Sequence, residues 1–266
     1  MEVHSARRAS YCGSLGLCDT LSMTSAVRIA MWSGPRCHST ALMRSFENRA
    51  DTRVVDEPFF GPYLATTRLE HPVAEVVITD QGRDPEAVAA RLAERAREAG
   101  GVQYEKHMAH HLLDGFPREW MPEARHAFLI RDPRSVLASY VKKREAIKVE
   151  DLGVHRQLEL YRHVKETLGQ PAPIVDARRL LEDPLMTLNR LCAKLDLEFD
   201  EAMLEWPAGR RESDGVWAGW WYDKLMRSTR FKPYKPKDVE LDDELQAIAD
   251  AALPAYEELL EISSTL

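Results

Sequence analysis

Three polar side chains that stand close together, Arg36, Ser39 and Thr40, are suited to binding an anion. They follow an apolar run that ends at Trp32, and they precede a segment whose apolar residues recur at helical spacing. The start of such a helix presents free N–H groups and the positive end of its dipole, and the guanidinium and the two hydroxyls add further donors. We therefore predict a site for a phosphate or sulfate group at this turn.

Other interpretations of the turn are less favourable. A Gly-Pro turn between a strand and a helix is common and usually binds nothing, but here an Arg, a Ser and a Thr coincide at the helix start. The nucleotide-binding loop G-x-x-x-x-G-K-[S/T] is excluded because His38 stands where its lysine belongs and no second glycine is present. The thiolate phosphatase loop is also excluded, because six residues separate Cys37 from Arg44 where that chemistry uses five.

A second cation and hydroxyl pair occurs further along the chain. Arg131 follows the apolar run A-F-L-I, and Ser139 comes eight residues later. An isolated pair of this kind would be an exposed arginine and a helical serine with no shared task. Here it is predicted at the same sheet edge as the first site, which suits a ligand with two separate anionic groups.

Strands and helices are expected to alternate along the chain and to position these residues. Apolar and β-branched runs predict strands over 27–32, 52–55, 102–106, 127–130 and 173–176. Capping residues and periodicity predict helices over 84–98, 155–168, 183–195 and 240–262. Two more helices are predicted, one that begins at Asp132 and Pro133 and one that Ser39 and Thr40 would cap. This alternation predicts an α/β fold of three layers, with a mostly parallel central sheet flanked by helices in a single domain. Ligands bind such sheets at the carboxyl ends of the strands.

The composition limits the class of protein. With 266 residues and 44% hydrophobic content the chain can bury one sizeable core, and its net charge of −7 argues against a general nucleic-acid binder. No apolar run approaches the roughly 20 residues that cross a bilayer. Four cysteines do not make a disulfide framework, so we expect a reducing, cytoplasmic location. Residues 1–22 lack apolar periodicity, and we interpret them as a disordered leader or as the product of a start codon placed too early, with the folded domain spanning 23–266.

In two motifs the chain resembles the sulfotransferases that use 3′-phosphoadenosine 5′-phosphosulfate. Segment 35–40 is similar to their 5′-phosphosulfate loop, P-R-S-G-[S/T]-[S/T], and Arg131 and Ser139 are similar to their 3′-phosphate pair, an Arg and a Ser eight residues apart. The resemblance extends over about 27–140 and implies a P-loop-like fold and a soluble enzyme with this donor and 3′,5′-bisphosphoadenosine as product. It implies the following donor-binding residues: Pro35, Arg36, Cys37, His38, Ser39, Thr40, Arg131 and Ser139.

The resemblance also indicates catalytic residues. Members that act on carbohydrates or tyrosine carry a Glu twenty-one residues after the loop Arg, often followed by Pro, and Glu57 stands at that spacing from Arg36. Transfer of a sulfuryl group requires removal of the acceptor proton, which a carboxylate or imidazole can perform, while Arg36 or Lys106 stabilises the leaving oxygen. Lys106 and His107 resemble the Lys-x-His of the cytosolic enzymes, but His107 is one residue out of register and is the second choice as base.

The chain departs from the family pattern at three places. The loop glycine is replaced by His38, and Ala41 stands where many cytosolic members have an adenine-stacking Trp. The C-terminal R-K-G-x-x-G motif has only a loose counterpart over 210–219. An aromatic cluster over 217–222 either lines a ligand site or packs a late helix onto the sheet, and we favour packing.

The leading hypothesis is therefore a sulfotransferase (EC 2.8.2 type) that acts on a hydroxyl or amine of a small-molecule acceptor, without a metal. His110 and His111 have no metal-ligand partners at a convincing spacing and are interpreted as surface or core residues. Two alternatives stay open: an ATP-dependent phosphotransferase in which Asp132 holds magnesium, and a non-catalytic sulfotransferase-like protein that binds a nucleotide. We expect no nucleic-acid or membrane partner, and the sequence indicates neither the acceptor nor the oligomeric state.

Overall fold

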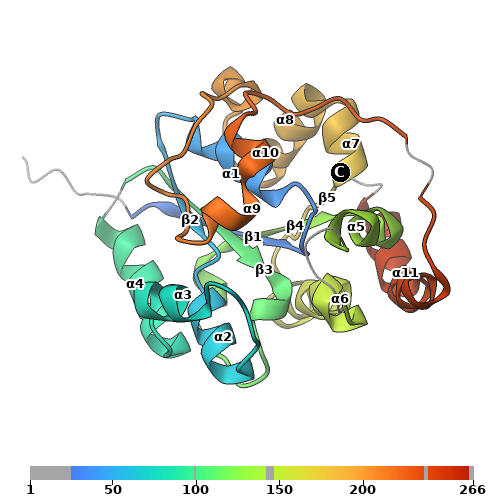
Figure 1. The fold of residues 1–266 in the computed structure, drawn as a ribbon. Helices are drawn as coiled ribbons and strands as arrows, with labels where there is room; N and C mark the ends of the chain where they lie inside the picture. Colours follow the sequence, from blue (N-terminus) through green and yellow to red (C-terminus); the bar gives the residue numbers. More distant parts are fainter. Residues whose placement is uncertain (1–24, 99, 142–146, 237–238, 264–266) are drawn as a thin grey trace, which may run out of the picture.

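Five strands form one sheet in the order β2-β3-β1-β4-β5 in the computed structural model of the chain (Figure 1). Every pairing in this sheet is parallel, which confirms the predicted α/β architecture. The structure describes residues 25–98, 100–141, 147–236 and 239–263, so residues 1–22, interpreted above as a leader, lie outside the described part. The strands are β1 (Val27–Ser33), β2 (Thr52–Asp56), β3 (Val102–Met108), β4 (Arg125–Ile130) and β5 (Ile174–Asp176).

The central strand, β1, is apolar on both of its faces. Ile29, Ala30, Met31 and Trp32 are all fully buried, as expected for a parallel strand that helices cover on both sides. β1 pairs with β3 along one edge and with β4 along the other. The loop that follows β1 therefore emerges between the carboxyl ends of β3 and β4, where the functional residues were predicted.

Helices cover the two faces of the sheet. In Figure 1, α1, α7 and α8 lie on one side of the strands, and α2, α4 and α6 lie on the other. Asp84, Asp132 and Asp183 begin three of the predicted helices, and each carboxylate accepts a backbone N–H from the first turn. The helices are α1 (Ser39–Glu47), α2 (Phe60–Thr67), α3 (Ala74–Gln81), α4 (Pro85–Glu98), α5 (Pro133–Tyr140), α6 (Val154–Arg162), α7 (Ala177–Glu182), α8 (Pro184–Lys194), α9 (Ala218–Trp221), α10 (Asp223–Met226) and α11 (Asp243–Ser263).

Two details of the predicted helices were wrong. Ser39 and Thr40 do not cap α1: the N-cap residue is His38, which has a left-handed backbone and makes no side-chain capping bond. The helix predicted over 155–168 is α-helical only as far as Arg162 and continues as a π-helical turn (His163–Thr167). The α1 difference matters for the site, because both hydroxyls lie within the first helical turn instead of before it.

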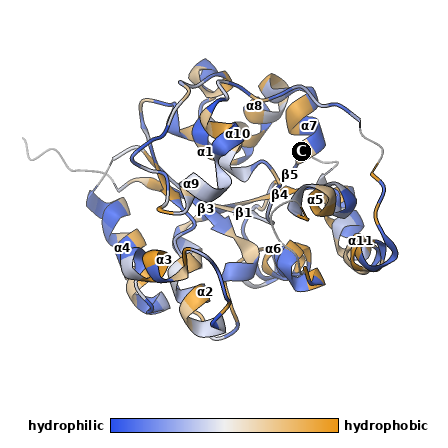
Figure 2. Cartoon of the chain, in the orientation of Figure 1, coloured by the Kyte–Doolittle hydropathy of each residue, from blue (hydrophilic) through white to orange (hydrophobic). Residues whose placement is uncertain are grey.

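Helices α2, α3, α7 and α10 were not predicted. Near its start α2 carries Gly61 and Pro62, two of the poorest helix formers, so its sequence resembles a turn. It packs on α3 and on the segment around α9, where Phe60, Val77, Trp217 and Tyr222 are among the buried residues of a second, smaller core. Figure 2 shows apolar stretches on α2 and α3 next to the mainly hydrophilic α4. Through Tyr222, which contacts Asp56 and Lys106, this second core reaches the carboxyl ends of β2 and β3.

The aromatic cluster over 217–222 belongs to the second core. Trp217 is 1% exposed and its ring meets Phe60 of α2 edge-on, at a centroid distance of 5.3 Å. The favoured interpretation as a packing element is correct for Trp217, but its packing partners are helices and not the sheet. Trp220, by contrast, is 55% exposed.

In the described part of the chain, no helix combines the length and the apolar character needed to span a bilayer.

Candidate functional site

The loop between β1 and α1 turns sharply because two of its residues adopt left-handed backbone conformations. Arg36 has φ = 58° and His38 has φ = 68°, and such values are uncommon for residues other than glycine. A Cβ atom at Gly34 would lie 2.3 Å from the carbonyl oxygen of Leu152, so only glycine fits there. Strained backbone of this kind persists where the surrounding structure fixes it, and it is concentrated at functional sites.

The two predicted anion sites adjoin each other. The Arg131 guanidinium donates from Nη1 to the carbonyl oxygen of Arg36 at 2.5 Å, and Arg36 Nε donates to Ser139 Oγ at 3.0 Å. Burial and the neighbouring charge of Arg131 lower the pKa of Arg36. No Asp or Glu among the described residues lies within 4.0 Å of either guanidinium. Arg36 and Arg131, which we call the cation pair, therefore have no carboxylate counter-ion in the described structure.

Two neighbouring residues of the loop, Cys37 and His38, are uncharged at neutral pH. Burial raises the pKa of the Cys37 thiol to about 12, so at neutral pH it is not a nucleophile. Its Sγ lies 3.4 Å from the carbonyl oxygen of Pro35. Burial, together with the charges of the cation pair, lowers the pKa of His38 to about 4, which keeps that ring neutral. Ser39 is 6% exposed at the first position of α1.

Beside the loop lies a buried group of acidic and basic residues that we call the acid–base cluster: Asp56, Glu57, Lys106 and Tyr222. The Lys106 ammonium is 2.6 Å from Asp56 Oδ1 and 2.9 Å from Glu57 Oε1, and it donates to the Tyr222 hydroxyl at 2.8 Å. It also donates to Thr40 Oγ1 at 3.2 Å, which links the cluster to the first turn of α1. Burial disfavours the charge on Lys106, but the two carboxylates outweigh it and hold the pKa of the ammonium well above its usual value.

Glu57 directly follows β2 in an unusual backbone conformation. Its φ is 43°, its N–H donates to the Lys106 carbonyl at 2.9 Å, and its own carbonyl accepts from Gln81 Nε2 at 3.0 Å. Burial raises the pKa of its carboxyl, and the Lys106 ammonium opposes that rise. The side chain remains 13% exposed. A carboxylate whose proton affinity is increased and which still reaches the surface has the properties of a general base.

His107 lies apart from this cluster. Successive side chains of a strand point to opposite faces, so His107 faces away from Lys106 and stacks on Trp32 at a centroid distance of 4.5 Å. Its Nε2 is 3.1 Å from Glu105 Oε2, and Glu105 also accepts from Arg28. Burial lowers the pKa of His107 although Glu105 acts in the opposite direction. The structure brings Glu57 and Lys106 together and places His107 on the other face of the sheet.

The site includes three residues that were not predicted from the sequence to be site residues: Asp56, Tyr222 and His111. Asp56 Oδ2 accepts from the Tyr222 hydroxyl at 2.7 Å and from the Gly215 N–H at 3.3 Å, so it fastens the segment before α9 to the end of β2. His111 Nδ1 lies 3.9 Å from Glu57 Oε2. The aromatic density around Tyr222 was the only available signal, because these contacts join residues far apart in the sequence.

The segment over 210–219, where the family's C-terminal motif was sought, contacts the site by other means. Asp214 is buried and pairs with the buried Arg44 of α1, and Arg211 donates to Glu47 at the end of α1 at 2.9 Å. The segment is thus fixed to the helix that follows the loop. Asp132, considered above as a magnesium ligand, accepts the Ser135 N–H at 2.9 Å as the N-cap of α5.

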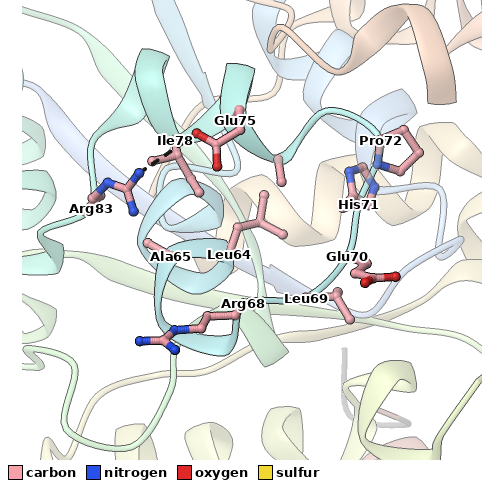
Figure 3. Close-up of a pocket in the computed structure, with 11 residues that line it drawn as sticks. Leu64, Ala65, Arg68, Leu69, Glu70, His71, Pro72, Glu75, Ile78 and Arg83 are labelled. Carbon is pink, nitrogen blue, oxygen red and sulfur yellow. Dashed lines mark ion pairs between the residues drawn. The ribbon is translucent and has the colours of Figure 1, made fainter.

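A separate hollow of about 780 Å³ opens between α2, α3 and the segment that joins them (Figure 3). Charged side chains stand around it, and Arg83 lies 3.9 Å from Glu75. His71 on its wall contacts Phe60 at a centroid distance of 5.6 Å. Neither the cation pair nor the acid–base cluster lines this hollow.

The sequence of the chain is similar to those of curated plant proteins. The chain is 35% identical over 230 residues to branched-chain-amino-acid aminotransferase-like protein 1 of Arabidopsis thaliana, a match that covers 86% of this chain and 40% of that protein. It is 36% identical over 205 residues to branched-chain-amino-acid aminotransferase-like protein 2 of the same plant, a match that covers 76% of this chain and 36% of that protein. The chain therefore spans about two-fifths of the length of these curated relatives.

Solved structures show the same fold. A sulfotransferase from Alicyclobacillus acidocaldarius matches with a TM-score of 0.54 at 16% identity, covering 90% of this chain and 97% of that one. The sulfotransferase domain of the Synechococcus PCC 7002 olefin synthase matches with a TM-score of 0.51 at 18% identity, covering 85% and 94%. At these identities the likeness concerns the fold alone. A sequence model described as the sulfotransferase domain matches residues 27–261, and the chain therefore belongs to the sulfotransferase domain family.

Proposed function

We propose that this protein is an enzyme that transfers a sulfuryl group from 3′-phosphoadenosine 5′-phosphosulfate to a hydroxyl or amine of a small acceptor. The observation that carries the proposal is the cation pair. The charge of Arg131 lies close enough to lower the pKa of Arg36, and no carboxylate of the described residues neutralises the two guanidinium groups. A ligand with phosphate groups at both ends supplies the missing negative charge, and guanidinium is well suited to phosphate oxygens.

The residues fit this donor in the following way. The loop over 35–40 and the N-terminus of α1 would hold the phosphosulfate end, with Arg36 and the hydroxyls of Ser39 and Thr40 as donors. Arg131 and Ser139 would hold the 3′-phosphate. The hydrogen bond from Arg36 to Ser139 indicates that the two subsites are joined. His38, which stands at the family's glycine position, is compatible because its backbone already has the left-handed conformation that glycine favours.

The acid–base cluster would perform the proton transfer. When bound, the donor supplies a sulfur atom with a phosphate leaving group, so that a bond forms from sulfur to the acceptor oxygen or nitrogen as the S–O bond to the phosphate breaks. Glu57 would take the acceptor's proton, because its carboxyl is partly exposed and has a raised pKa. Lys106, which also contacts Thr40 of the loop, would oppose the negative charge that develops on the leaving oxygen. We also propose a cytoplasmic location, since the described cysteines, Cys37 and Cys192, are buried free thiols.

Thermal shift measurements test the donor assignment without knowledge of the acceptor. We expect 3′,5′-bisphosphoadenosine to raise the melting temperature in the absence of magnesium, and by more than adenosine 5′-phosphate does, because only the former has a 3′-phosphate for Arg131. An Arg131→Gln variant should lose that difference. Stabilisation by ATP only in the presence of magnesium would instead support a phosphotransferase. Binding of the bisphosphate without any sulfated product from a broad acceptor panel would support a non-catalytic nucleotide-binding protein.

A further inference from the structure

His111 stands next to the proposed base in an environment that leaves one of its nitrogens without a partner. It ends a short 3₁₀ helix (Ala109–His111) that directly follows β3. Its ring is held between Phe60 and Tyr63, with centroid distances of 4.6 Å and 4.7 Å and interplanar angles of 2° and 27°. The residue is 4% exposed, and its buried Nδ1 has no hydrogen-bond partner among the described residues.

The unpartnered nitrogen faces the carboxylate of Glu57. His111 Nδ1 and Glu57 Oε2 are 3.9 Å apart, which is too far for a direct hydrogen bond. A single oxygen atom at about 2.8 Å from each of them would bridge the two. A buried polar atom without a partner carries an energetic cost that a native structure seldom tolerates without a reason. The spacing leaves room for one oxygen atom of a bound ligand to act as this partner.

On the basis of the function proposed above, we propose that His111 is a positioning residue that holds the acceptor oxygen against Glu57, and that the site therefore selects hydroxyl acceptors over amines. The adjacent carboxylate favours the tautomer with the proton on Nδ1, so this nitrogen donates to the acceptor oxygen. Glu57 accepts the hydroxyl proton on the same oxygen. The stack between Phe60 and Tyr63 fixes the direction of the N–H.

The preference for a hydroxyl follows from its lone pairs. A hydroxyl oxygen has two: one can accept the hydrogen bond from His111 while the other attacks the sulfur. A neutral amine has a single lone pair, and a hydrogen bond from His111 would occupy the pair that must attack. Burial, with the charges of His110 and Lys106, holds the pKa of His111 well below its usual value, so the ring is neutral and does not compete with Glu57 for the proton.

Three substitutions of His111 separate the bond from the stacking. In His111→Asn the amide nitrogen can occupy the place of Nδ1 but the ring is lost. In His111→Phe the stacked ring is kept but both nitrogens are lost. His111→Gln is the matched control, because its amide reaches the place of Nε2 and not that of Nδ1. For each variant the melting temperature and the affinity for 3′,5′-bisphosphoadenosine report on folding and on the donor site, and neither depends on turnover.

Transfer is then measured with a matched pair of probes, 2-naphthol and 2-naphthylamine, and with water, scored as sulfate released from the donor. We expect the wild-type protein to act on 2-naphthol or water and not on the amine. His111→Phe and His111→Gln should lower kcat on the order of 10- to 100-fold, the range expected when a reacting group is misplaced. His111→Asn should recover most of that loss, and the affinity for the bisphosphate should stay within about twofold of wild type in every folded variant.

Several results would overturn the assignment. If His111→Phe is as active as wild type, or more active than His111→Asn, the residue acts through packing alone. Equal transfer to the amine and the naphthol would remove the hydroxyl preference. If the wild-type protein binds the bisphosphate but transfers to none of the three probes, the Glu57 and His111 pair is not an acceptor site, while donor binding stands. If the bisphosphate itself does not bind, it is the proposed function that fails.

Discussion

Replacing Lys106 by Met removes the only cation that contacts both carboxylates of the acid–base cluster in the described structure. The exposed fractions of the side chains are 1% for Lys106, 1% for Asp56 and 13% for Glu57, and the ammonium lies 2.6 Å and 2.9 Å from the two carboxylates. Removing one partner of a buried ion pair typically costs about 3–5 kcal/mol, because the remaining charge stays buried without compensation. We expect Lys106→Met to lower the free energy of unfolding by about that amount at pH 8.

The loss should depend on pH in a defined direction. Burial raises the pKa of Glu57, and the Lys106 ammonium restrains the rise, so the variant should raise this pKa further. A carboxyl with a higher pKa in the folded state is neutral in both states below its unfolded pKa of about 4.3, and there it costs nothing. Above that pH the unfolded state loses its proton first, so the folded state becomes progressively less stable. The destabilisation should therefore be small near pH 4.5, grow as the pH rises from the unfolded pKa toward the raised folded pKa, and stay constant above it.

Urea unfolding at pH 4.5, 6 and 8 measures this effect. The double variant Lys106→Met with Glu57→Gln has no ionisable group at position 57, so much of the pH dependence should disappear. Lys165→Met, at an exposed lysine, is the matched control and should change stability by no more than about 0.5 kcal/mol. An equal loss at all three pH values, or a pH dependence unchanged in the double variant, would refute the assignment of buried, coupled charges.

Two further outcomes test the loop and the base. Because His38 has φ = 68°, His38→Gly should be more stable than His38→Ala by about 1 kcal/mol. In the control, Ala41→Gly within α1 should be less stable than wild type by about 1 kcal/mol. If urea unfolding shows that Ala is more stabilising than Gly at position 38, the left-handed conformation of the loop is contradicted. Glu57→Gln should keep its affinity for 3′,5′-bisphosphoadenosine and lose about 10²–10⁴-fold in kcat. Full turnover would exclude Glu57 as the base.

The sequence was sufficient for residues whose place is determined by local structure. Arg36, Ser39 and Thr40 follow a strand and open a helix, so their position at the sheet edge follows from the strand-turn-helix pattern alone. Arg131 likewise comes at the end of an apolar strand. Since the carboxyl ends of parallel strands lie at one edge of the sheet, the proximity of Arg131 to Arg36 could be expected before any coordinates.

Residues that reach the site through the tertiary structure could not be found in this way. Tyr222 meets Asp56 across 166 positions of sequence, and no local pattern indicates such a contact. From the sequence, His111 was interpreted as an ordinary surface or core histidine. Its neighbours in the stack, Phe60 and Tyr63, belong to α2, and this helix was not predicted because it contains a glycine and a proline. Its functional signal is the unpartnered nitrogen, which exists only in three dimensions.

The choice between Lys106 and His107 depends on strand register, which the sequence does not determine. β2 and β3 pair so that Asp56 stands opposite Lys106, and residues opposite each other in a sheet point to the same face. This register places the ammonium between Asp56 and Glu57 and sends His107 to the far face, where Glu105 and Trp32 hold it. A slip of one residue would reverse the two side chains and bring an imidazole to the carboxylates. Gly101, the residue before β3, opposes such a slip: the slip would put Val102 in its place, where a Cβ would lie 2.2 Å from the carbonyl oxygen of Asp51 just before β2. Close packing at the start of these strands thus determines which side chain meets Glu57 at their ends.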